Sequence, residues 1–325
     1  IDSSSVATLA ARHHEGPLRT YTAGFDQGLD SDERPRAARL AEGLGTDHHE
    51  IQVRVGDLRE VIEALAGIHD EPFADAANIP LYLLCRQLAE EGTKVVLQGD
   101  GGDEIFAGYR RYNVLSHEWA WRLAARPGLA ALSAFPAAPW VSRGRRWLSI
   151  FAERDPALRM ALLLTMESRR RPPTRLLSAE VREALRAHDP FRAYREIGGF
   201  FGDADAVNRM LYTDCLLQLP DQFLAKVDRP TMACSIEVRV PFLDTGLTDY
   251  VIPLPSRFKV PRLEKKHLLR RALRGSVADE ILDAPKRGFD VPYARWLRGG
   301  LAGLLRSALL DPATGSSGLF RPSEL

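Results

Sequence analysis

The first hundred residues alternate between strand-like and helix-like segments, and this alternation restricts the fold more than any other feature. The strand-like segments are 20–25, 50–53 and 94–97, and the helical segments are 3–12, 34–43, 58–68 and 81–91. Strands that alternate with helices over short links form a parallel sheet with helices on both faces. The sequence therefore predicts an α/β fold with a parallel sheet in this part of the chain.

The last of these strands runs directly into a glycine-rich acidic loop. Val95-Val96-Leu97 is followed by Gln98-Gly99-Asp100-Gly101-Gly102-Asp103-Glu104. Glycines let bare backbone approach a ligand, and carboxylates bind hard cations or position a nucleophile. In parallel sheets, ligands bind beyond the carboxyl ends of the strands. The loop is therefore the leading candidate for a ligand site, and a solvated acidic turn is the alternative.

After Tyr112 the composition becomes rich in alanine, leucine and arginine, which indicates helices. Within residues 114–202 we expect prolines to break these helices at Pro127, Pro136, Pro139, Pro156 and Pro172-Pro173. More helices follow from Asn208, with loop-like segments at 239–246 and 285–292. We therefore divide the chain into an α/β part (1–113), a helical insertion (114–205) and a second helical part (206–325).

The charge balance argues against nucleic acid or a membrane as a partner. The chain has 44 lysines and arginines against 43 aspartates and glutamates, a net charge of +1, so it has no global field to steer polyanions. The arginine runs 143–146 and 169–171 lack interleaved aromatic residues and indicate solvated helix faces. No apolar run is as long as a membrane span. Three cysteines without C-x-x-C spacing favour buried thiols in a reducing, cytoplasmic setting.

Several other segments carry candidate ligands, each with a structural alternative. Asp2-Ser3-Ser4 opens a helix and suits phosphate oxygens, although a plain helix cap explains it equally. His48 and His49 are adjacent at a strand start, so they point to opposite faces and do not easily share a metal ion. The segments 226–229 and 237–244 alternate charged and apolar residues, which alone indicates strand-like structure with internal ion pairs. Lys286 precedes a glycine turn that suits either a mobile cation over phosphate or a surface loop.

In combination, these motifs resemble the synthetase domain of the asparagine synthetase (glutamine-hydrolysing) family, within the ATP-pyrophosphatase fold group. The matching segments occur in order along the chain: Ile1-Asp2-Ser3-Ser4 (SGG-x-DSS, second half), Asp70–Asp75 (DEPFAD), Gln98–Tyr109 (SGDGGDE-x-F-x-GY), Leu219-Pro220-Asp221 with Lys226–Arg229 and Glu237–Asp244 (LPD…KVDR…EVRVPFLD), and Lys286–Pro292 (PK-x-GF-x-VP). The resemblance implies an adenine nucleotide α-hydrolase-like fold whose first strand is truncated. It also assigns nucleotide binding to residues 1–113 and the substrate side to 206–325.

The resemblance implies ATP-dependent amide formation in two steps. A substrate carboxylate, most simply that of aspartate, attacks the α-phosphate of ATP and gives an acyl-adenylate and pyrophosphate; ammonia then displaces AMP. Mg²⁺ is implied, with Asp2 and Asp103 as oxygen ligands that suit this ion. Asp100 is implied as the group that orients ammonia or accepts its proton, and Lys286 as the cation at the transferred phosphate.

The same motifs supply the remaining expected site residues. Contacts to ATP and pyrophosphate are expected from Asp2, Ser3, Ser4, Gln98, Gly99 and Lys266. Substrate contacts or supporting positions are expected from Asp75, Tyr109, Asp214, Asp221, Glu237 and Arg239. Asp214 and Asp221 both remain open as a carboxylate partner of Asp100. Gln98 stands where the family usually has serine, so the contacts to adenosine are expected to differ there.

The resemblance also implies partners and leaves rival functions open. The partners are a small carboxylate substrate, ammonia and an upstream glutaminase domain, and a homodimer is among the assemblies open to such a chain. The Ser-Gly-Gly half of the phosphate loop is absent, so we expect the isolated chain to be inactive.

The nearest rivals are a β-lactam synthetase, a peptide macrocyclase and an amidotransferase of surface-polymer or natural-product pathways. Asp100 argues against the first, because β-lactam synthetases resemble the family but carry tyrosine there. An adenylating enzyme without nitrogen transfer and a non-catalytic homologue are further alternatives. The second of these is disfavoured because Asp2, Asp103 and Lys286 are all intact.

Overall fold

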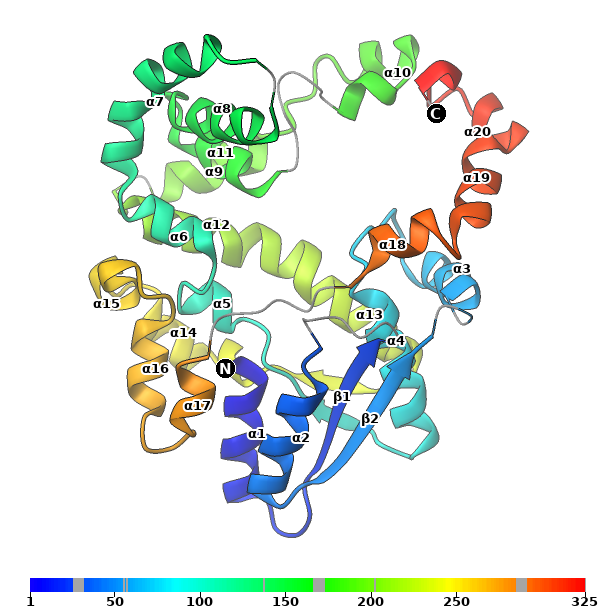
Figure 1. Cartoon of the computed structure of the whole chain (residues 1–325), viewed down its shortest axis with the longest axis vertical. Coiled ribbons are helices and arrows are strands. Elements are labelled where there is room, and N and C mark those ends of the chain that lie inside the picture. Colours follow the sequence, from blue (N-terminus) through cyan, green and yellow to red (C-terminus); the bar gives the residue numbers. More distant parts are fainter. Residues whose placement is uncertain are drawn as a thin grey trace. The chain divides into compact units, whose positions relative to one another are not determined.

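A computed structural model describes residues 1–25, 32–54, 56, 58–136, 138–165, 173–201, 203–284 and 291–324 (Figure 1). These residues fall into two units. Unit 1 comprises Ile1–Asp103, Gln218–Tyr250 and Leu268–Leu305, and unit 2 comprises Glu104–Leu217, Val251–His267 and Arg306–Leu325. Both units are assembled from segments far apart in the sequence, and the boundaries predicted at 113 and 205 stay a prediction.

Unit 1 contains two pairs of parallel strands. β1 (Arg19–Phe25) pairs with β2 (Asp47–Val53), and β3 (Val95–Leu97) pairs with β4 (Glu237–Arg239). The α/β class and the parallel pairing predicted from the sequence are confirmed. The described strands nevertheless form two separate two-stranded sheets rather than one continuous sheet.

Most of the chain is helical. The helices wholly or mostly in unit 1 are α1 (Asp2–His13), α2 (Arg34–Leu44), α3 (Leu58–Ile68), α4 (Asn78–Glu90), α13 (Ala225–Ala233), η4 (Pro241–Leu243), α14 (Thr245–Val251), α16 (His267–Leu273), α17 (Asp279–Leu282) and α18 (Tyr293–Arg298). Those wholly or mostly in unit 2 are α6 (Arg110–Leu115), α7 (Glu118–Ser133), α8 (Pro139–Phe151), α9 (Pro156–Leu164), η2 (Pro173–Leu176), α10 (Ala179–Ala184), α11 (Arg192–Phe200), α12 (Ala206–Thr213), α15 (Ser256–Lys259), η5 (Pro261–Leu263), α19 (Ala302–Leu310), α20 (Pro312–Ser316) and η6 (Pro322–Glu324). Two short elements contain residues of both units: α5 (Gly102–Ile105) and η3 (Asp214–Leu224).

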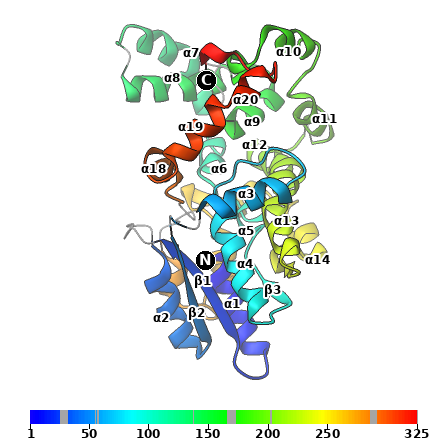
Figure 2. The same cartoon turned by 90° about the vertical axis from the view of Figure 1, so that its right-hand side faces the viewer.

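Two residues of β1, Tyr21 and Gly24, point to opposite faces of the first strand pair, and a helix packs on each face. Tyr21 packs against the cluster of Cys85 and Leu88 on α4. On the opposite face, Gly24 leaves room for the Arg34 side chain of α2, whose Nε would lie 2.1 Å from a Cβ at that glycine. Successive strand residues point to opposite sides of a sheet. α2 and α4 therefore cover opposite faces of this pair, as Figures 1 and 2 show and as the sequence predicted.

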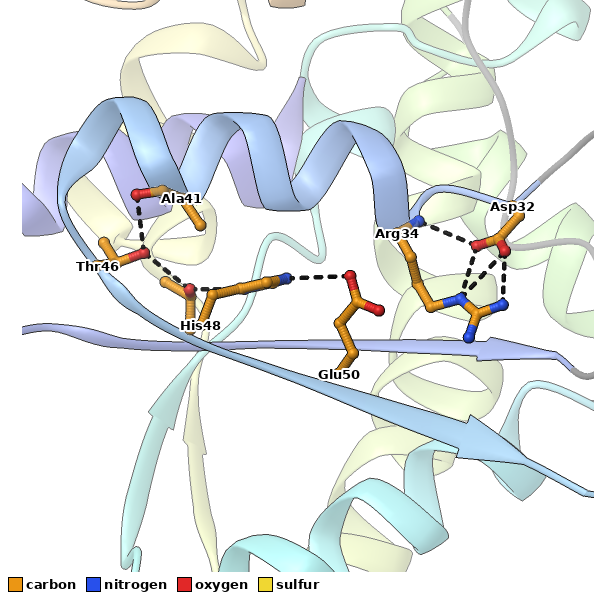
Figure 3. A network of polar contacts seen from close by, with 7 residues as sticks. Asp32, Arg34, Ala41, Thr46, His48 and Glu50 are labelled. Carbon is orange, nitrogen blue, oxygen red and sulfur yellow. Dashed lines mark hydrogen bonds and ion pairs between the residues drawn. The ribbon is translucent and has the colours of Figure 1, made fainter.

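The face of β2 that carries His48 holds a small polar network (Figure 3). His48 Nδ1 lies 2.9 Å from the Thr20 hydroxyl, and its Nε2 lies 3.9 Å from Glu50. His49 lies 3.1 Å from Asp47 instead. Each histidine thus faces the carboxylate two residues away on its own side, which confirms that the adjacent imidazoles point to opposite faces.

Unit 2 is helical, and its prolines behave in two different ways. Pro139 and Pro156 stand at the starts of α8 and α9, where a missing N–H costs nothing. Helices therefore break there as predicted. Pro127 instead lies inside α7, so the break predicted there was wrong. α7 packs along α8, and this tertiary packing offsets the hydrogen bond that proline removes.

The segments 226–229 and 237–244 also differ in part from their prediction as strand-like. Only Glu237–Arg239 is a strand, and Arg239 Nε lies 2.7 Å from Glu237 Oε1 in an internal ion pair as predicted. Lys226–Arg229 lies in helix α13, where Val227, Pro230 and Thr231 are buried at helical spacing. Its two cations pair outside the segment, with Asp75 and Asp70.

Two findings bear on the environment of the chain. All three cysteines are free thiols, and burial raises the pKa of Cys85 and Cys215 to about 12. Such thiols are inert at neutral pH. Cys85 is buried as predicted, whereas Cys215 and Cys234 are only partly buried. Among the described residues, every helix is too short or too polar for a membrane span.

Candidate active site

The glycine-rich loop after β3 packs directly against the start of α1. A Cβ at Gly99 would lie 2.5 Å from the backbone nitrogen of Ser3, and a Cβ at Gly102 would lie 2.6 Å from Oδ1 of Asp2. Real Cβ atoms do not approach so closely. At Gly99 the neighbour is backbone, so only glycine permits the contact, whereas at Gly102 a larger residue would displace the Asp2 side chain. The fold therefore brings together the two segments that the sequence singled out for phosphate and metal, 2–4 and 98–103.

The other side of the loop is shaped by the segment around β4. Gln98 N donates a hydrogen bond of 2.9 Å to the carbonyl oxygen of Arg239, which extends the β3–β4 ladder by one residue. Gly101 has φ +84°, and a Cβ there would lie 2.4 Å from Cδ2 of Leu243 in η4. Glu237 and Arg239, both expected near the substrate, are exposed on β4 and paired with each other.

Asp100 and Asp103 of this loop each have one buried carboxylate oxygen without a hydrogen-bond donor among the described residues. For Asp100, whose pKa is shifted, that oxygen is Oδ2. Burial raises the pKa of Asp100; the positive charge of Lys226 opposes this rise, and Asp2 and Asp103 add to it. A carboxylate with a raised pKa and an open lone pair is a stronger base than a surface aspartate. Asp100 can therefore accept a proton from a group that enters the site.

Lys226 supplies the cation of this region and was missed as a site residue by the sequence analysis. It projects from α13, which packs against α3 and α4. Its Nζ lies 3.7 Å from Oδ2 of Asp75 and 5.2 Å from the centre of the Phe223 ring. The same charge acts on the pKa of Asp100. The KVDR motif was the available signal, but it identified a segment and not the side chain within it that matters.

The donor set suits Mg²⁺ when phosphate accompanies it. Asp2 and Asp103 both act on the pKa of Asp100, so three carboxylates share this region. The described residues contain no group of three or more side chains placed to hold a metal. Mg²⁺ commonly binds through only one or two carboxylates, with phosphate oxygens and water completing its shell. Asp2 and Asp103 therefore fit a metal that arrives with a nucleotide rather than a resident metal.

Two further predicted residues belong to a buried network in unit 2. The Tyr109 hydroxyl donates to Glu104, and the guanidinium of Arg111 lies 3.9 Å from the centre of the Tyr109 ring. Asp214 is fully buried, and its Oδ2 accepts from Tyr112 and lies 2.9 Å from Nη2 of Arg111. Burial raises the pKa of Asp214 although Arg111 and these hydrogen bonds lower it.

The remaining predicted residues are spread over both units. Ser3 and Ser4 lie in the first turn of α1. Asp221 is exposed in η3, a π-helix, and belongs to unit 1. Lys266 is buried in unit 2 with φ +54°. Lys286 lies outside the described residues, so its assigned role stays a prediction.

Comparison with known proteins identifies the family. The family model described as asparagine synthase matches residues 1–325, and the chain therefore belongs to that family. This confirms the resemblance drawn from the ordered motifs. The match extends over the strand–loop region, the helical insertion and the segment around β4 alike.

Three relatives illustrate the similarity. A Mycobacterium tuberculosis protein provisionally named asparagine synthetase (glutamine-hydrolyzing) is 33% identical over 309 residues, which cover 92% of this chain and 45% of the relative. Asparagine synthetase (glutamine-hydrolyzing) 1 of Bacillus subtilis is 29% identical over 320 residues, or 97% and 48% of the two chains. Amidase chry2 of Gibberella zeae is 25% identical over 342 residues, or 93% and 49%. The chain thus spans about half the length of the curated relatives it matches.

Proposed function

We propose that this chain is the synthetase part of an ATP-dependent, amide-forming ligase. Its substrate carboxylate is most simply that of aspartate, and the product is then asparagine. The observation that carries the proposal is the contact between the Gly99–Asp103 loop and the start of α1, which gathers Asp2, Asp100 and Asp103 beside bare backbone. Membership of the asparagine synthase family supports the same reaction class.

In the first step, an oxygen of the substrate carboxylate attacks the α-phosphorus of ATP, and the bond to the pyrophosphate oxygen breaks. The first backbone N–H groups of α1, in Asp2-Ser3-Ser4, have no helical acceptors and suit phosphate oxygens. Asp2 and Asp103 are the residues that hold Mg²⁺, which when bound offsets the charge on the phosphates. Gln98, Gly99, Lys266 and Lys286 are assigned to the nucleotide and pyrophosphate on the strength of the family motifs.

In the second step, ammonia attacks the acyl carbon, a C–N bond forms and AMP departs with the electrons of the acyl C–O bond. Asp100 accepts the proton that the attacking nitrogen loses, because its Oδ2 is open and burial raises its pKa. Lys226 limits that rise and stays paired with Asp75. The ammonia is proposed to come from a glutaminase domain, since the relatives are named glutamine-hydrolyzing.

A second candidate keeps the chemistry and changes the carboxylate. The similarity to Amidase chry2, which is not named an asparagine synthetase, favours it. In this case the acceptor is a larger carboxylate from natural-product or surface-polymer biosynthesis. Aspartate and a larger carboxylate would present the same reacting groups, a carboxylate and the phosphates of ATP, to Asp2, Asp100 and Asp103. The two candidate functions therefore differ only in the rest of the substrate.

The test uses the full-length protein and measures pyrophosphate release from ATP and Mg²⁺ with aspartate present or absent, followed by asparagine formation with ammonia or glutamine. Release that requires aspartate, yields asparagine and is lost in Lys286→Ala would establish the proposal. Lys94→Ala, a change of an exposed lysine beside β3, is the matched control and should keep full activity. ATP binding without any dependence on aspartate would overturn asparagine synthesis and favour the second candidate. Pyrophosphate release without nitrogen transfer would leave only an adenylating enzyme.

A further inference from the structure

Unit 2 carries a groove that the proposed reaction does not use. Its volume is about 440 Å³. One wall is helix α7, and the other is the end of α8 with the residues that follow it. The lining residues are Trp119, Arg122, Leu123, Arg126, Phe151, Ala152, Glu153 and Arg154.

One face of α7 presents two large apolar side chains in this groove. The lining positions 119, 122, 123 and 126 recur at the spacing of a single helix face. Trp119 is 71% exposed and Leu123 is 75% exposed. Ala125, on another side of the helix, is fully buried in the core of the unit. Single apolar residues scattered over a surface are normal. Here two of them lie side by side in the groove, where a partner's apolar side chain can cover both.

The groove also has an excess of positive charge. Arg122, Arg126 and Arg154 are exposed, and none of them forms an ion pair with a described residue. The one carboxylate of the lining, Glu153, accepts hydrogen bonds from the backbone N–H groups of Arg154 and Asp155 at 2.8 and 3.3 Å.

Neighbouring arginines of the same unit show the contrast. Arg159 lies 2.8 Å from Glu118, Arg192 lies 2.7 Å from Glu196, and both pairs bridge side chains within the unit. With a net charge of +1 over the whole chain, most cations are balanced. The excess around Trp119 and Leu123 is local.

We propose that this groove binds a protein segment in which acidic residues flank a large apolar side chain. The apolar side chain packs between Trp119 and Leu123, and the carboxylates pair with Arg122, Arg126 and Arg154. Guanidinium groups bind carboxylates through two parallel hydrogen bonds, and a groove of this volume holds one or two side chains of a partner. This is the pattern of a peptide anchored in a groove and surrounded by charge.

The same observations disfavour nucleic acid and a membrane surface. Three cations release few counterions, so they give weak binding to a phosphate backbone. Trp119 offers one exposed ring for stacking, and Leu123 offers none, so successive bases find no row of stacking platforms here. A membrane-binding face needs a longer apolar stripe than two residues. The inference does not depend on the proposed ligase activity, because none of its residues belongs to the candidate active site.

The experiment selects a random 12-residue peptide library on the full-length protein, with the variant Arg122→Gln/Arg126→Gln/Arg154→Gln as counter-selection. Enriched sequences should place two or more aspartates or glutamates around leucine, phenylalanine or tryptophan. Their affinity, measured by fluorescence anisotropy, should fall at least tenfold in the triple variant and in Trp119→Ala, and should weaken with salt. The matched control, Arg143→Gln/Arg257→Gln/Arg306→Gln, removes the same charge from exposed positions of unit 2 outside the groove and should bind as the wild type does.

Three results would overturn the proposal. One is enrichment of basic or uncharged peptides, or of no sequence at all. Another is equal weakening in the groove variant and its control, which would reduce the effect to net charge. The third is groove-dependent binding of single-stranded DNA or of vesicles rich in anionic lipid with no binding of acidic peptides. Circular dichroism of each variant separates these results from a loss of folding.

Discussion

Two aspartates with buried carboxylate oxygens, Asp100 in unit 1 and Asp214 in unit 2, have different neighbours. Burial raises the pKa of both Asp100 and Asp214. Oδ2 of Asp214 lies 2.9 Å from Arg111 and accepts a hydrogen bond from Tyr112. Oδ1 of Asp214 accepts no hydrogen bond from any described residue. Asp100 has an Oδ2 without a donor among the described residues, and two of its neighbours, Asp2 and Asp103, raise its pKa further.

A perturbed pKa therefore does not by itself identify a reactive group. Desolvation acts on both carboxylates, and only the partners distinguish them. The surroundings of Asp214 compensate its charge, as in a structural ion pair that fixes α6 to the start of η3. One oxygen of each carboxylate lacks a hydrogen-bond donor among the described residues, but the open oxygen of Asp100 lies in a region that it shares with two other carboxylates. This is expected where a reactant or its metal ion is to supply the missing partner.

The largest effect on activity is expected from Asp100→Asn. The amide cannot accept a proton from ammonia, so amide formation should fall by about 10²- to 10⁴-fold, while ATP binding persists. Stability at neutral pH should not fall. The folded pKa of Asp100 lies above its ordinary value of 3.8, so this residue favours folding most at low pH, and that contribution is lost as pH rises through the folded pKa. The rate with saturating ATP, aspartate and ammonia, together with urea unfolding, measures both parts.

Asp249→Asn provides the control, since Asp249 is an exposed carboxylate of the same unit. It should leave the rate and the stability unchanged. If Asp100→Asn kept the wild-type rate, Asp100 would not be the base of amide formation. A variant that lost rate and stability together would assign Asp100 to the same structural class as Asp214.

The largest effect on stability is expected from Asp214→Asn. The change leaves the guanidinium of Arg111 largely buried without its counter-charge, and breaking a buried pair in this way costs about 3–5 kcal/mol. Urea unfolding followed by circular dichroism measures the loss. Asp189→Asn breaks the exposed pair with Arg195 and should barely change stability. A small effect at Asp214 would show that the network holds Arg111 without it, and would reopen a substrate role for this carboxylate.

Much of the fold was predictable because most elements near the start of the chain carry their own local signal. Helix 58–68 shows helical periodicity and was predicted with the bounds that α3 has. The pairing of β3 with β4 was not predictable, because three residues are too few for a periodic pattern and the partner lies far along the chain. Helix α13 was read as strand-like since its ion-pair partners, Asp75 and Asp70, lie in a distant segment.

The candidate site was predictable in its parts but not in its assembly. The composition of 98–103, with its glycines and carboxylates, predicts a ligand-binding loop. That Gly102 lies against Asp2 is a tertiary contact between segments a hundred residues apart, which no local pattern encodes. The open Oδ2 of Asp100 and the charge of Lys226 upon it depend on that assembly too. The role of Lys286 still rests on its motif.

A substitution at Gly99 tests whether the loop must touch α1. In Gly99→Ala the new Cβ would meet the backbone of Ser3 at 2.5 Å, and backbone cannot rotate away as a side chain can. We expect a loss of about 1–3 kcal/mol in stability, as for other overpacked sites, and weaker ATP binding because the phosphate segment moves. Unfolding curves and calorimetric titration with ATP report the two effects.

Gly43→Ala is the matched control for the glycine substitution. Gly43 lies in α2 with open space where its Cβ would be. Alanine is the better helix former, so this variant should gain up to about 1 kcal/mol. If Gly99→Ala bound ATP as tightly as the wild type, nucleotide binding would not depend on the contact between the loop and α1.

The smallest effect on the rate is expected from a change of Lys226, which tests how the pKa of Asp100 is set. Its charge lowers the pKa of Asp100 against the rise caused by burial, so Lys226→Met should raise that pKa further. Asp100 acts as a base only when deprotonated, so the rate rises as pH passes its pKa; in the variant this rise should move to higher pH. Below the rise the rate should fall by about 3- to 10-fold, while the plateau at high pH is kept.

Lys94→Met, which removes an exposed lysine beside β3, should leave the kcat/KM profile in place. A profile that does not move in Lys226→Met would mean that Asp100 works without this cation. An equal loss at every pH would mean that Lys226 serves the substrate rather than the pKa of Asp100.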